Sequence, residues 1–176
     1  AARRPVPEQT RRNQLLAADP TVSAWVSANA GTGKTHVLSR RVLRLMLAGR
    51  DAERRLVGTP PERILCLTFT KAAAAEMAQR VFKDLGDWAI LDAASLETRL
   101  HELLGRAPDG EERQLARRLF ARAIETPGGL KVQTIHSFSE KLLQRFPLEA
   151  GIAPNFTVLD DAAARDLLST AIDGCL

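Results

Sequence analysis

The sequence predicts an α/β fold, in which a mostly parallel sheet is covered by helices on both faces. Four short apolar runs rich in β-favouring residues alternate with helical patterns: 21–28, 63–69, 130–135 and 156–159. A glycine turn follows the first of these runs and opens a helix, and the stretch at about 86–129 has a purely helical pattern. We therefore expect strand–helix units with a helical insertion, and ligands at the carboxyl ends of the strands.

The N-terminal half begins with a polar arm and a short helix at about 10–18. After the strand at 21–28 and the glycine turn, apolar residues at helical spacing predict a helix that ends at Gly49. Its three arginines, Arg40, Arg41 and Arg44, are expected to face away from the apolar side.

The rest of the chain continues the alternation. A polar loop at 50–62 precedes the second strand, and the helix that follows it carries an apolar stripe of Ala74, Met77, Ala78, Val81 and Leu85. The helical stretch at 86–129 has two further stripes on either side of the turn APDG at 107–110. The third and fourth strands each lead into a helix, at 137–146 and 160–172.

Composition sets limits on the class of protein. A chain of 176 residues with 45% hydrophobic and 26% charged residues is typical of one soluble globular domain. A net charge of +4 permits a polyanionic partner without requiring one. Cys66 and Cys175 lie too far apart for a zinc motif or a disulfide framework, which favours a reducing, cytoplasmic location. We find neither an apolar signal core nor a membrane-length run, so no membrane association is expected.

The segment ANAGTGKT (28–35) has the pattern of a phosphate-binding loop. Gly31 and Gly33 allow the backbone N–H groups to approach phosphate oxygens at the positive end of a helix dipole. Lys34 can reach the β and γ phosphates, and Thr35 can offer its hydroxyl to Mg²⁺. The alternative is an ordinary strand–turn–helix joint with a solvated lysine, and we favour the nucleotide site.

Two further strand ends carry candidate nucleic-acid contacts. In LTFTKAAAAEM (67–77), the residues Thr68, Phe69, Thr70 and Lys71 combine phosphate donors with a ring for stacking. The plainer alternative makes Phe69 a core residue and the alanines helix formers. In VQTIHSFSEKLL (132–143), His136 and Ser137 follow a strand, although a histidine there is more often a capping or structural residue.

The run FTVLDD (156–161) resembles a Walker B strand, whose carboxylates would hold Mg²⁺. We favour a helix cap by Asp160 or Asp161 instead, because the glutamine that would follow such a pair is absent from DDAAAR.

As an ordered set, Gln14, ANAGTGKT, TFTKAAAAEM, TIHSF and FTVLDD resemble the N-terminal part of superfamily 1 DNA helicases of the UvrD/Rep/RecB group, in particular the AddA subunits of AddAB helicase–nucleases. The resemblance covers nearly the whole chain, and the pair TFT…AAAAEM and TIHSF is more specific than GKT. In UvrD-like relatives the first of these reads TFTNKAA, so Lys71 stands here in the place of the asparagine and Ala72 in the place of the lysine.

The resemblance implies that residues 1–176 form the N-terminal part of a first RecA-like, UvrD-like ATP-binding domain, with an insertion at about 86–129. It implies ATP and Mg²⁺ as cofactors, Lys34 and Thr35 as the catalytic Walker A pair, and Thr35 as the Mg²⁺ contact. Gln14 would select adenine, and the nucleotide would contact Gln14, Ala28, Asn29, Ala30, Gly31, Thr32, Gly33, Lys34, Thr35 and His36. DNA would contact Thr68, Phe69, Thr70, Lys71, Thr134, His136 and Ser137, with Ile135 and Phe138 completing the last motif.

The implied activity is ATP-dependent unwinding of single- and double-stranded DNA substrates in double-strand-break repair and recombination, with an exonuclease and an AddB-like partner subunit in the longer parent protein. The DExxQ carboxylates, the arginine finger and the second RecA-like domain of that family are not in this sequence. We therefore expect a fragment that binds nucleotide weakly at best and does not hydrolyse ATP alone. Two alternatives are a small P-loop kinase and a stand-alone module that binds nucleotide or single-stranded DNA.

Overall fold

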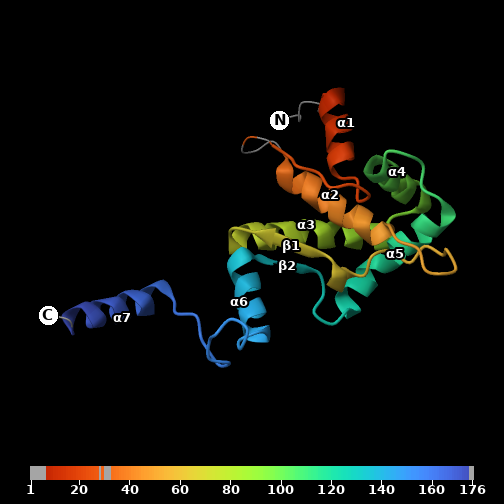
Figure 1. The fold of residues 1–176 in the computed structure, drawn as a ribbon. Coiled ribbons are helices and arrows are strands. Elements are labelled where there is room, and N and C mark those ends of the chain that lie inside the picture. The colour runs from red at the N-terminus through yellow and green to blue at the C-terminus, as the bar shows by residue number, and fades with distance from the viewer. Residues whose placement is uncertain (1–6, 28, 30–32, 175–176) are drawn as a thin grey trace. The chain divides into compact units, whose positions relative to one another are not determined.

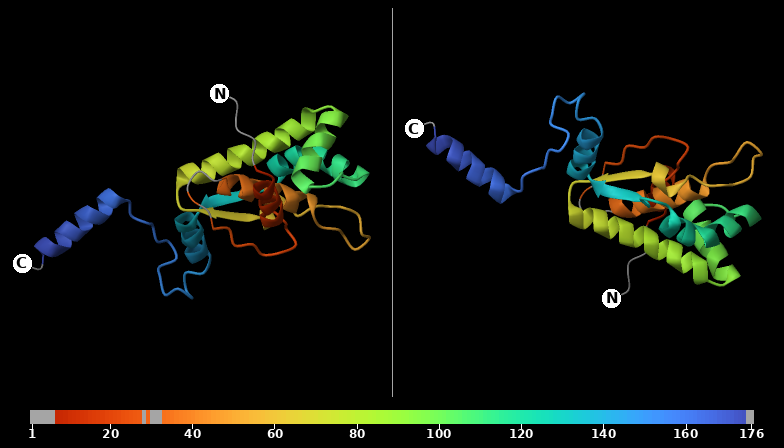
Figure 2. Two further views of the ribbon diagram at one scale, coloured as in Figure 1. Left: turned by 90° about the horizontal axis from the view of Figure 1, so that it is seen from above. Right: turned by 90° about the horizontal axis from the view of Figure 1, so that it is seen from below.

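The computed structural model describes residues 7–27, 29 and 33–174 (Figures 1 and 2). The chain divides into two compact units, Ala1–Gln133 and Thr134–Leu176. Its elements in chain order are α1 (Glu8–Ala17), α2 (Lys34–Leu47), the 3₁₀ turn η1 (Pro61–Arg63), β1 (Leu65–Thr68), α3 (Lys71–Ile90), α4 (Ala93–Leu104), α5 (Gly110–Glu125), β2 (Lys131–Thr134), α6 (Ile135–Arg145) and α7 (Asp161–Asp173).

The helix α3 is the spine of the first unit. It begins at Lys71 because the Thr70 side chain accepts a hydrogen bond from the Ala73 N–H at 3.1 Å. The predicted stripe is confirmed, and the helix runs past its predicted end at Leu85 to Ile90. Its buried side chains recur three or four residues apart: Ala74, Met77, Val81, Leu85 and Trp88.

The core lies where α2, α4 and α5 pack around α3 (Figure 1). α3 contacts α5 most extensively and α2 next. Burial of this apolar surface is the main stabilising contribution to the unit. Besides the α3 residues, the buried cluster contains Val42, Leu43, Met46 and Leu47 of α2, Leu96, Leu100 and Leu103 of α4, and Ala116, Leu119 and Ala123 of α5.

The stretch at about 86–129 is helical as predicted, and it comprises the end of α3 with α4 and α5. The Asp92 side chain caps α4, and Gly105 ends it in the left-handed conformation with φ 74°. Asp109 and Glu112 form a capping box at the start of α5, since each side chain accepts from the other residue's backbone N–H. The turn at 107–110 therefore separates the two helices as expected.

Two of the four predicted strands are strands in the structure. β1 and β2 lie within the predicted runs and pair side by side, and their arrows point the same way in Figure 2, as in a parallel sheet. The prediction was wrong for 21–27 and for 156–159, which form no strand in the part of the chain that the structure describes. A strand needs a neighbouring backbone to accept and donate its hydrogen bonds, and these two runs have none there. Most of their large apolar side chains are exposed, including Trp25 at 95% and Val158 at 63%.

The second unit contains α6 and α7. α6 begins two residues before its predicted start, after the cap provided by Thr134. α7 begins after Asp160, whose Oδ1 accepts from the N–H groups of Ala162 at 3.1 Å and Ala163 at 2.8 Å. This confirms the cap interpretation of Asp160 rather than a Walker B role. The described helices include none that is long and apolar enough to cross a lipid bilayer.

Candidate functional site

The phosphate-loop segment ends in α2 as predicted. Gly33 is the N-cap residue of α2 with φ 93° and ψ 20°, a left-handed conformation that glycine adopts without a steric penalty. Lys34 and Thr35 open the helix, so they lie at the positive end of its dipole. Asn29 is also described, whereas four predicted contact residues lie outside the described residues: Ala28, Ala30, Gly31 and Thr32.

The Lys34 side chain folds back over the loop. Its Nζ donates a hydrogen bond to the backbone carbonyl of Asn29 at 2.7 Å. One turn further along α2, the Ser39 hydroxyl donates to the Thr35 carbonyl at 2.9 Å, which ties the first turn of the helix to its buried side.

Gln14 comes from α1 and lies beside the same turn. Its Nε2 is 3.6 Å from the position that a Cβ on Gly33 would take. Two predicted nucleotide contacts that are far apart in sequence are thus brought together. His36, one residue beyond Thr35, lines the same side of α2. Its pKa is lowered by partial burial and then by the nearby guanidinium groups of Arg40 and Arg80, so the imidazole is neutral at pH 7.

The three arginines of α2 lie away from its buried apolar side as expected, and their guanidinium groups bind backbone carbonyls of neighbouring segments. Arg41 donates to the carbonyls of Ala17, Asp19 and Val22 at 3.2, 2.5 and 2.6 Å, and Arg44 donates to the Leu15 carbonyl at 2.8 Å. Arg40 donates to the Glu102 carbonyl in the last turn of α4. Cations are favoured at helix C-termini, where carbonyls lack partners within the helix. One indication of this pairing is visible in the sequence. The last turn of α1 has no basic residue that could bind its terminal carbonyls, so a cation from another element is favoured there.

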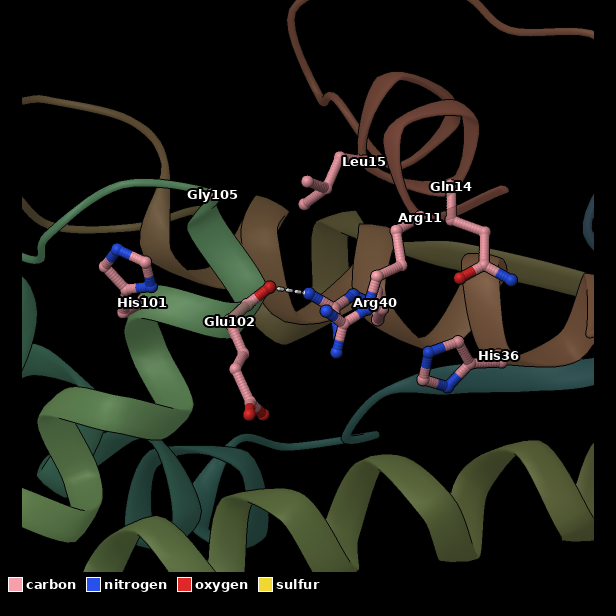
Figure 3. A pocket seen from close by; sticks show the side chains of 8 residues that line it. All are labelled: Arg11, Gln14, Leu15, His36, Arg40, His101, Glu102 and Gly105. Carbon is pink, nitrogen blue, oxygen red and sulfur yellow. Dashed lines mark hydrogen bonds between the residues drawn. The ribbon is translucent and has the colours of Figure 1, made fainter. Parts of the chain in front are cut away.

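A pocket of about 430 Å³ lies between α1, α2 and α4 (Figure 3). The Arg11 and Arg40 side chains reach into its middle, with Gln14 and His36 toward one end and His101 and Glu102 toward the other. Of these, only Gln14 and His36 were predicted as contacts. The α4 wall was missed because the helical stretch at 86–129 carries no recognisable motif. The complete lining is Arg11, Gln14, Leu15, His36, Arg40, His101, Glu102 and Gly105.

At the end of β1, the predicted DNA-contact segment presents an exposed ring. Phe69 is 84% exposed, so the alternative that it belongs to the core is wrong. The Thr68 hydroxyl donates to the Thr70 carbonyl at 3.0 Å, and Thr70 caps α3. Lys71 follows as the first, exposed residue of that helix. Hydroxyls, a helix N-terminus and an aromatic ring therefore lie next to one another.

The second predicted DNA-contact segment forms the start of α6. Thr134 is buried, accepts from the Ser137 N–H at 3.1 Å and donates to the Ser137 hydroxyl at 3.0 Å. His136 is exposed, so the capping role that we weighed for it belongs to Thr134. Ser137 is half-buried in the same first turn.

Comparison with known proteins agrees with these features. Residues 9–174 match the family of the UvrD/REP helicase N-terminal domain. The chain is 31% identical over 166 residues to a subunit of the ATP-dependent helicase/nuclease of Enterococcus faecalis, covering 94% of this chain and 11% of that protein. The same-named proteins of Streptococcus sanguinis and Lactobacillus gasseri are 31% and 32% identical, over 84% and 81% of this chain and 10% and 9% of theirs. The chain thus spans about a tenth of the length of these relatives. The chain belongs to the UvrD/REP helicase family and matches the N-terminal domain of that family.

Proposed function

We propose that this chain is the ATP-binding N-terminal part of an AddA-type DNA helicase–nuclease, which unwinds DNA in double-strand-break repair and recombination. In this proposal, residues 1–176 are the start of a first RecA-like domain with a helical insertion at about 86–129. The membership of the family and the names of the relatives support it. A cytoplasmic location, the DNA substrate and an AddB-like partner subunit belong to the same proposal.

The observation that carries the nucleotide site is the meeting of Gln14 with the Gly33 turn. A phosphate loop alone binds many nucleotides, whereas a glutamine amide beside it can pair with the N6 and N7 edge of adenine. In the proposal, Lys34 balances the charge of the β and γ phosphates and Thr35 supplies a hydroxyl ligand to Mg²⁺. The remaining cradle consists of residues 28–33 and His36.

Hydrolysis is not expected from this chain alone. Positioned Mg²⁺ and an oriented water require carboxylates opposite the phosphate loop. Asp160, which follows the Walker B-like run, instead accepts two backbone hydrogen bonds at the start of α7. This engagement supports a structural role for Asp160.

The DNA-binding part of the proposal rests on Phe69. A ring that is 84% exposed beside the first turn of a helix suits base stacking, and the Thr68, Thr70 and Lys71 positions suit phosphates. We propose Thr134, His136 and Ser137 as a second set of contacts.

Titration calorimetry with Mg²⁺–ATP tests the nucleotide site. Lys34→Ala should weaken binding about 10- to 100-fold, because it removes a charge-assisted contact. Lys83→Ala is the matched control, since this exposed lysine pairs only with Asp87 on the surface of α3 in the contacts described. Equal affinity of the Lys34→Ala and Lys83→Ala proteins would refute the assignment.

Fluorescence anisotropy with a labelled single-stranded oligonucleotide tests the DNA site. Phe69→Ala should weaken binding by about 1–3 kcal/mol, the contribution of one stacked base. Ile90→Ala removes an equally exposed apolar side chain, 84% exposed, at the far end of α3 and should leave the affinity unchanged. A loss shared by both variants would argue against a specific stacking contact.

A further inference from the structure

We infer that Arg41 and Arg44 are positioning residues that hold Gln14 beside the phosphate loop and so set the base selectivity of the site. The inference rests on the proposed nucleotide site, and it concerns two side chains that are not expected to touch the nucleotide. We call Arg41 and Arg44 the arginine clamp.

The arginine clamp completes the hydrogen bonding at the C-terminus of α1. The last four carbonyls of a helix have no partner within it. Here Gln14 and Leu16 carbonyls accept from the N–H groups of Ala18 and Asp19, at 3.0 and 3.1 Å. The two alternate carbonyls, of Leu15 and Ala17, accept from Arg44 and Arg41. The end of α1 is therefore bonded to α2 through the residues on either side of Leu16.

Apolar packing fixes α1 only weakly. None of its side chains is buried, and Leu16 is 61% exposed. Leu15 is half-buried, with its Cδ1 3.4 Å from the position that a Cβ on Gly105 would take. Because so little apolar surface is covered, the polar bonds to the helix end have a large share in fixing where α1 lies.

The position of α1 decides where the Gln14 amide lies. The carbonyl that Arg44 binds belongs to the residue directly after Gln14. Hydrogen bonds weaken steeply outside a narrow range of distance and angle, so a small displacement of α1 removes the pairing with adenine. The proposed phosphate contacts come from residues 28–33 and from the first turn of α2, and such a displacement of α1 does not move them. Loss of the clamp should therefore lower base selectivity without lowering phosphate affinity.

The two arginines differ in what could replace them. Arg44 makes one hydrogen bond to α1, which a lysine can also make. Arg41 reaches three carbonyls with two nitrogens, and a single ammonium group cannot reproduce that fork. Arg44→Lys should therefore preserve selectivity, whereas Arg41→Lys should not.

The experiment measures the affinity of the chain for ATP, GTP and tripolyphosphate by calorimetry, and the hydrogen exchange of the α1 amides by mass spectrometry. Arg44→Ala and Arg41→Ala should lower the ATP-to-GTP affinity ratio on the order of 10- to 100-fold, as Gln14→Ala does, with unchanged tripolyphosphate affinity. The double variant Gln14→Ala/Arg44→Ala should lose no more than Gln14→Ala. Exchange at residues 8–17 should speed up in both arginine variants. Arg55→Ala, which removes an exposed arginine in the loop after α2, is the control and should change none of these.

Undiminished selectivity in both arginine variants of a selective wild-type chain would overturn the inference and leave the proposed function standing. Additive losses of base selectivity in the double variant would also overturn it. Unfolding of the whole chain in both alanine variants would overturn it too, since the arginines would then stabilise the unit as a whole. A wild-type chain that binds ATP no better than GTP would instead overturn the proposed adenine site, and the inference with it.

Discussion

Gly58→Ala tests how closely the loop after α2 approaches the end of that helix. Gly58 has φ 69°, and a Cβ there would lie 1.9 Å from the Met46 carbonyl oxygen and 3.2 Å from Cδ2 of Leu115. Real Cβ atoms essentially never approach another atom that closely. The alanine therefore cannot be accommodated unless the backbone of the loop moves.

The size of the effect follows from two contributions. A non-glycine residue in the left-handed region costs about 1–2 kcal/mol. Moving the loop breaks the hydrogen bonds from the Gly58 N–H to the Gly49 carbonyl and from the Thr59 N–H to the Leu45 carbonyl, at 3.2 and 3.1 Å. Each is worth about 0.5–1.5 kcal/mol. The free energy of unfolding should fall by about 2–5 kcal/mol in all, with a drop in Tm of roughly 4–20 °C.

Urea unfolding, followed by far-UV circular dichroism and by the fluorescence of the buried Trp88, measures this loss. Two other glycines separate the contributions. Gly128 has φ 77° with open space around it, so Gly128→Ala should lose only the conformational cost of about 1–2 kcal/mol. Gly110 is the first residue of α5, lies in open space and does not have a positive φ, so Gly110→Ala should lose nothing and could gain about 0.4–1 kcal/mol.

The order of the three variants in urea midpoint tests the predicted contact between Gly58 and the Met46 carbonyl. A Gly58→Ala protein that unfolds at the same urea concentration as Gly128→Ala would show that no backbone contact with Met46 exists. The placement of the loop against α2 would then be wrong, although the left-handed conformation could still be right.

Three further outcomes follow from the titration of buried groups. Burial raises the pKa of the Cys66 thiol to about 11 from an ordinary 9.0. In a Cys175→Ser background, Cys66 of the folded chain should therefore react with a disulfide reagent at pH 8 about a hundred-fold more slowly than Cys66 of the chain unfolded in urea. Arg106 binds the buried Glu112 and lowers its pKa below the ordinary 4.5; Arg106→Ala should reduce the free energy of unfolding by about 1–2 kcal/mol at pH 7. Since that stabilisation is lost as the pH falls through the folded pKa of Glu112, the difference between variant and wild type in urea midpoints should shrink below pH 4.5. The lowered pKa of His36 acts in the same direction at higher pH, because the unfolded chain takes up a proton near pH 6.5 and the folded chain does not, so the fold loses stability as the pH falls. His36→Gln should therefore weaken the decline of Tm between pH 7.5 and 5.5, as followed by calorimetry.

The sequence predicted the helices well because each one carries its own signals. Thr70, Asp92, Asp109 and Asp160 each stand before a helix and cap it in the structure. These are local interactions between residues two or three apart, so the order of residues is enough to find them. The stripe on α3 is local in the same sense, since its spacing depends only on the helical period.

The predictions that failed depend on a partner distant in the chain. The run at 21–28 has the composition of a strand, yet a strand also requires a neighbour, and β1 and β2 pair with each other in the described sheet. The carbonyl partners of Arg41 and Arg44 could not be predicted either, because they lie on α1 and in the segment after it, 19–29 residues away, and depend on how two helices pack. The alternative that Phe69 belongs to the core failed in the other direction, since an aromatic residue after a buried strand has the same appearance in sequence whether it packs inward or is exposed.

Within the candidate site, sequence analysis named the residues for which chemistry is proposed and missed the neighbours that support them. Gln14, Lys34 and Thr35 belong to recognisable patterns, whereas the α4 wall of the pocket, with His101 and Glu102, belongs to none. A supporting residue can be any side chain of sufficient reach, so its identity follows from tertiary geometry. Arg40 illustrates this, because its role is set by the end of α4, 62 residues further along the chain.

The arrangement of α2 explains why these supporting residues accumulate on one helix. Its first turn carries Lys34 and Thr35, and its apolar face, with Val42, Leu43 and Met46, lies in the core. The flank of α2 between those two surfaces carries Arg40, Arg41 and Arg44, which bind the neighbouring elements. Arginine suits that flank because its stem covers apolar surface while its fork reaches carbonyls at the ends of neighbouring helices. The core residues fix the position of α2 itself. Removal of Arg41 or Arg44 should therefore act mainly on α1, the helix that these two side chains bind. The contrast between base selectivity and phosphate affinity measures that effect.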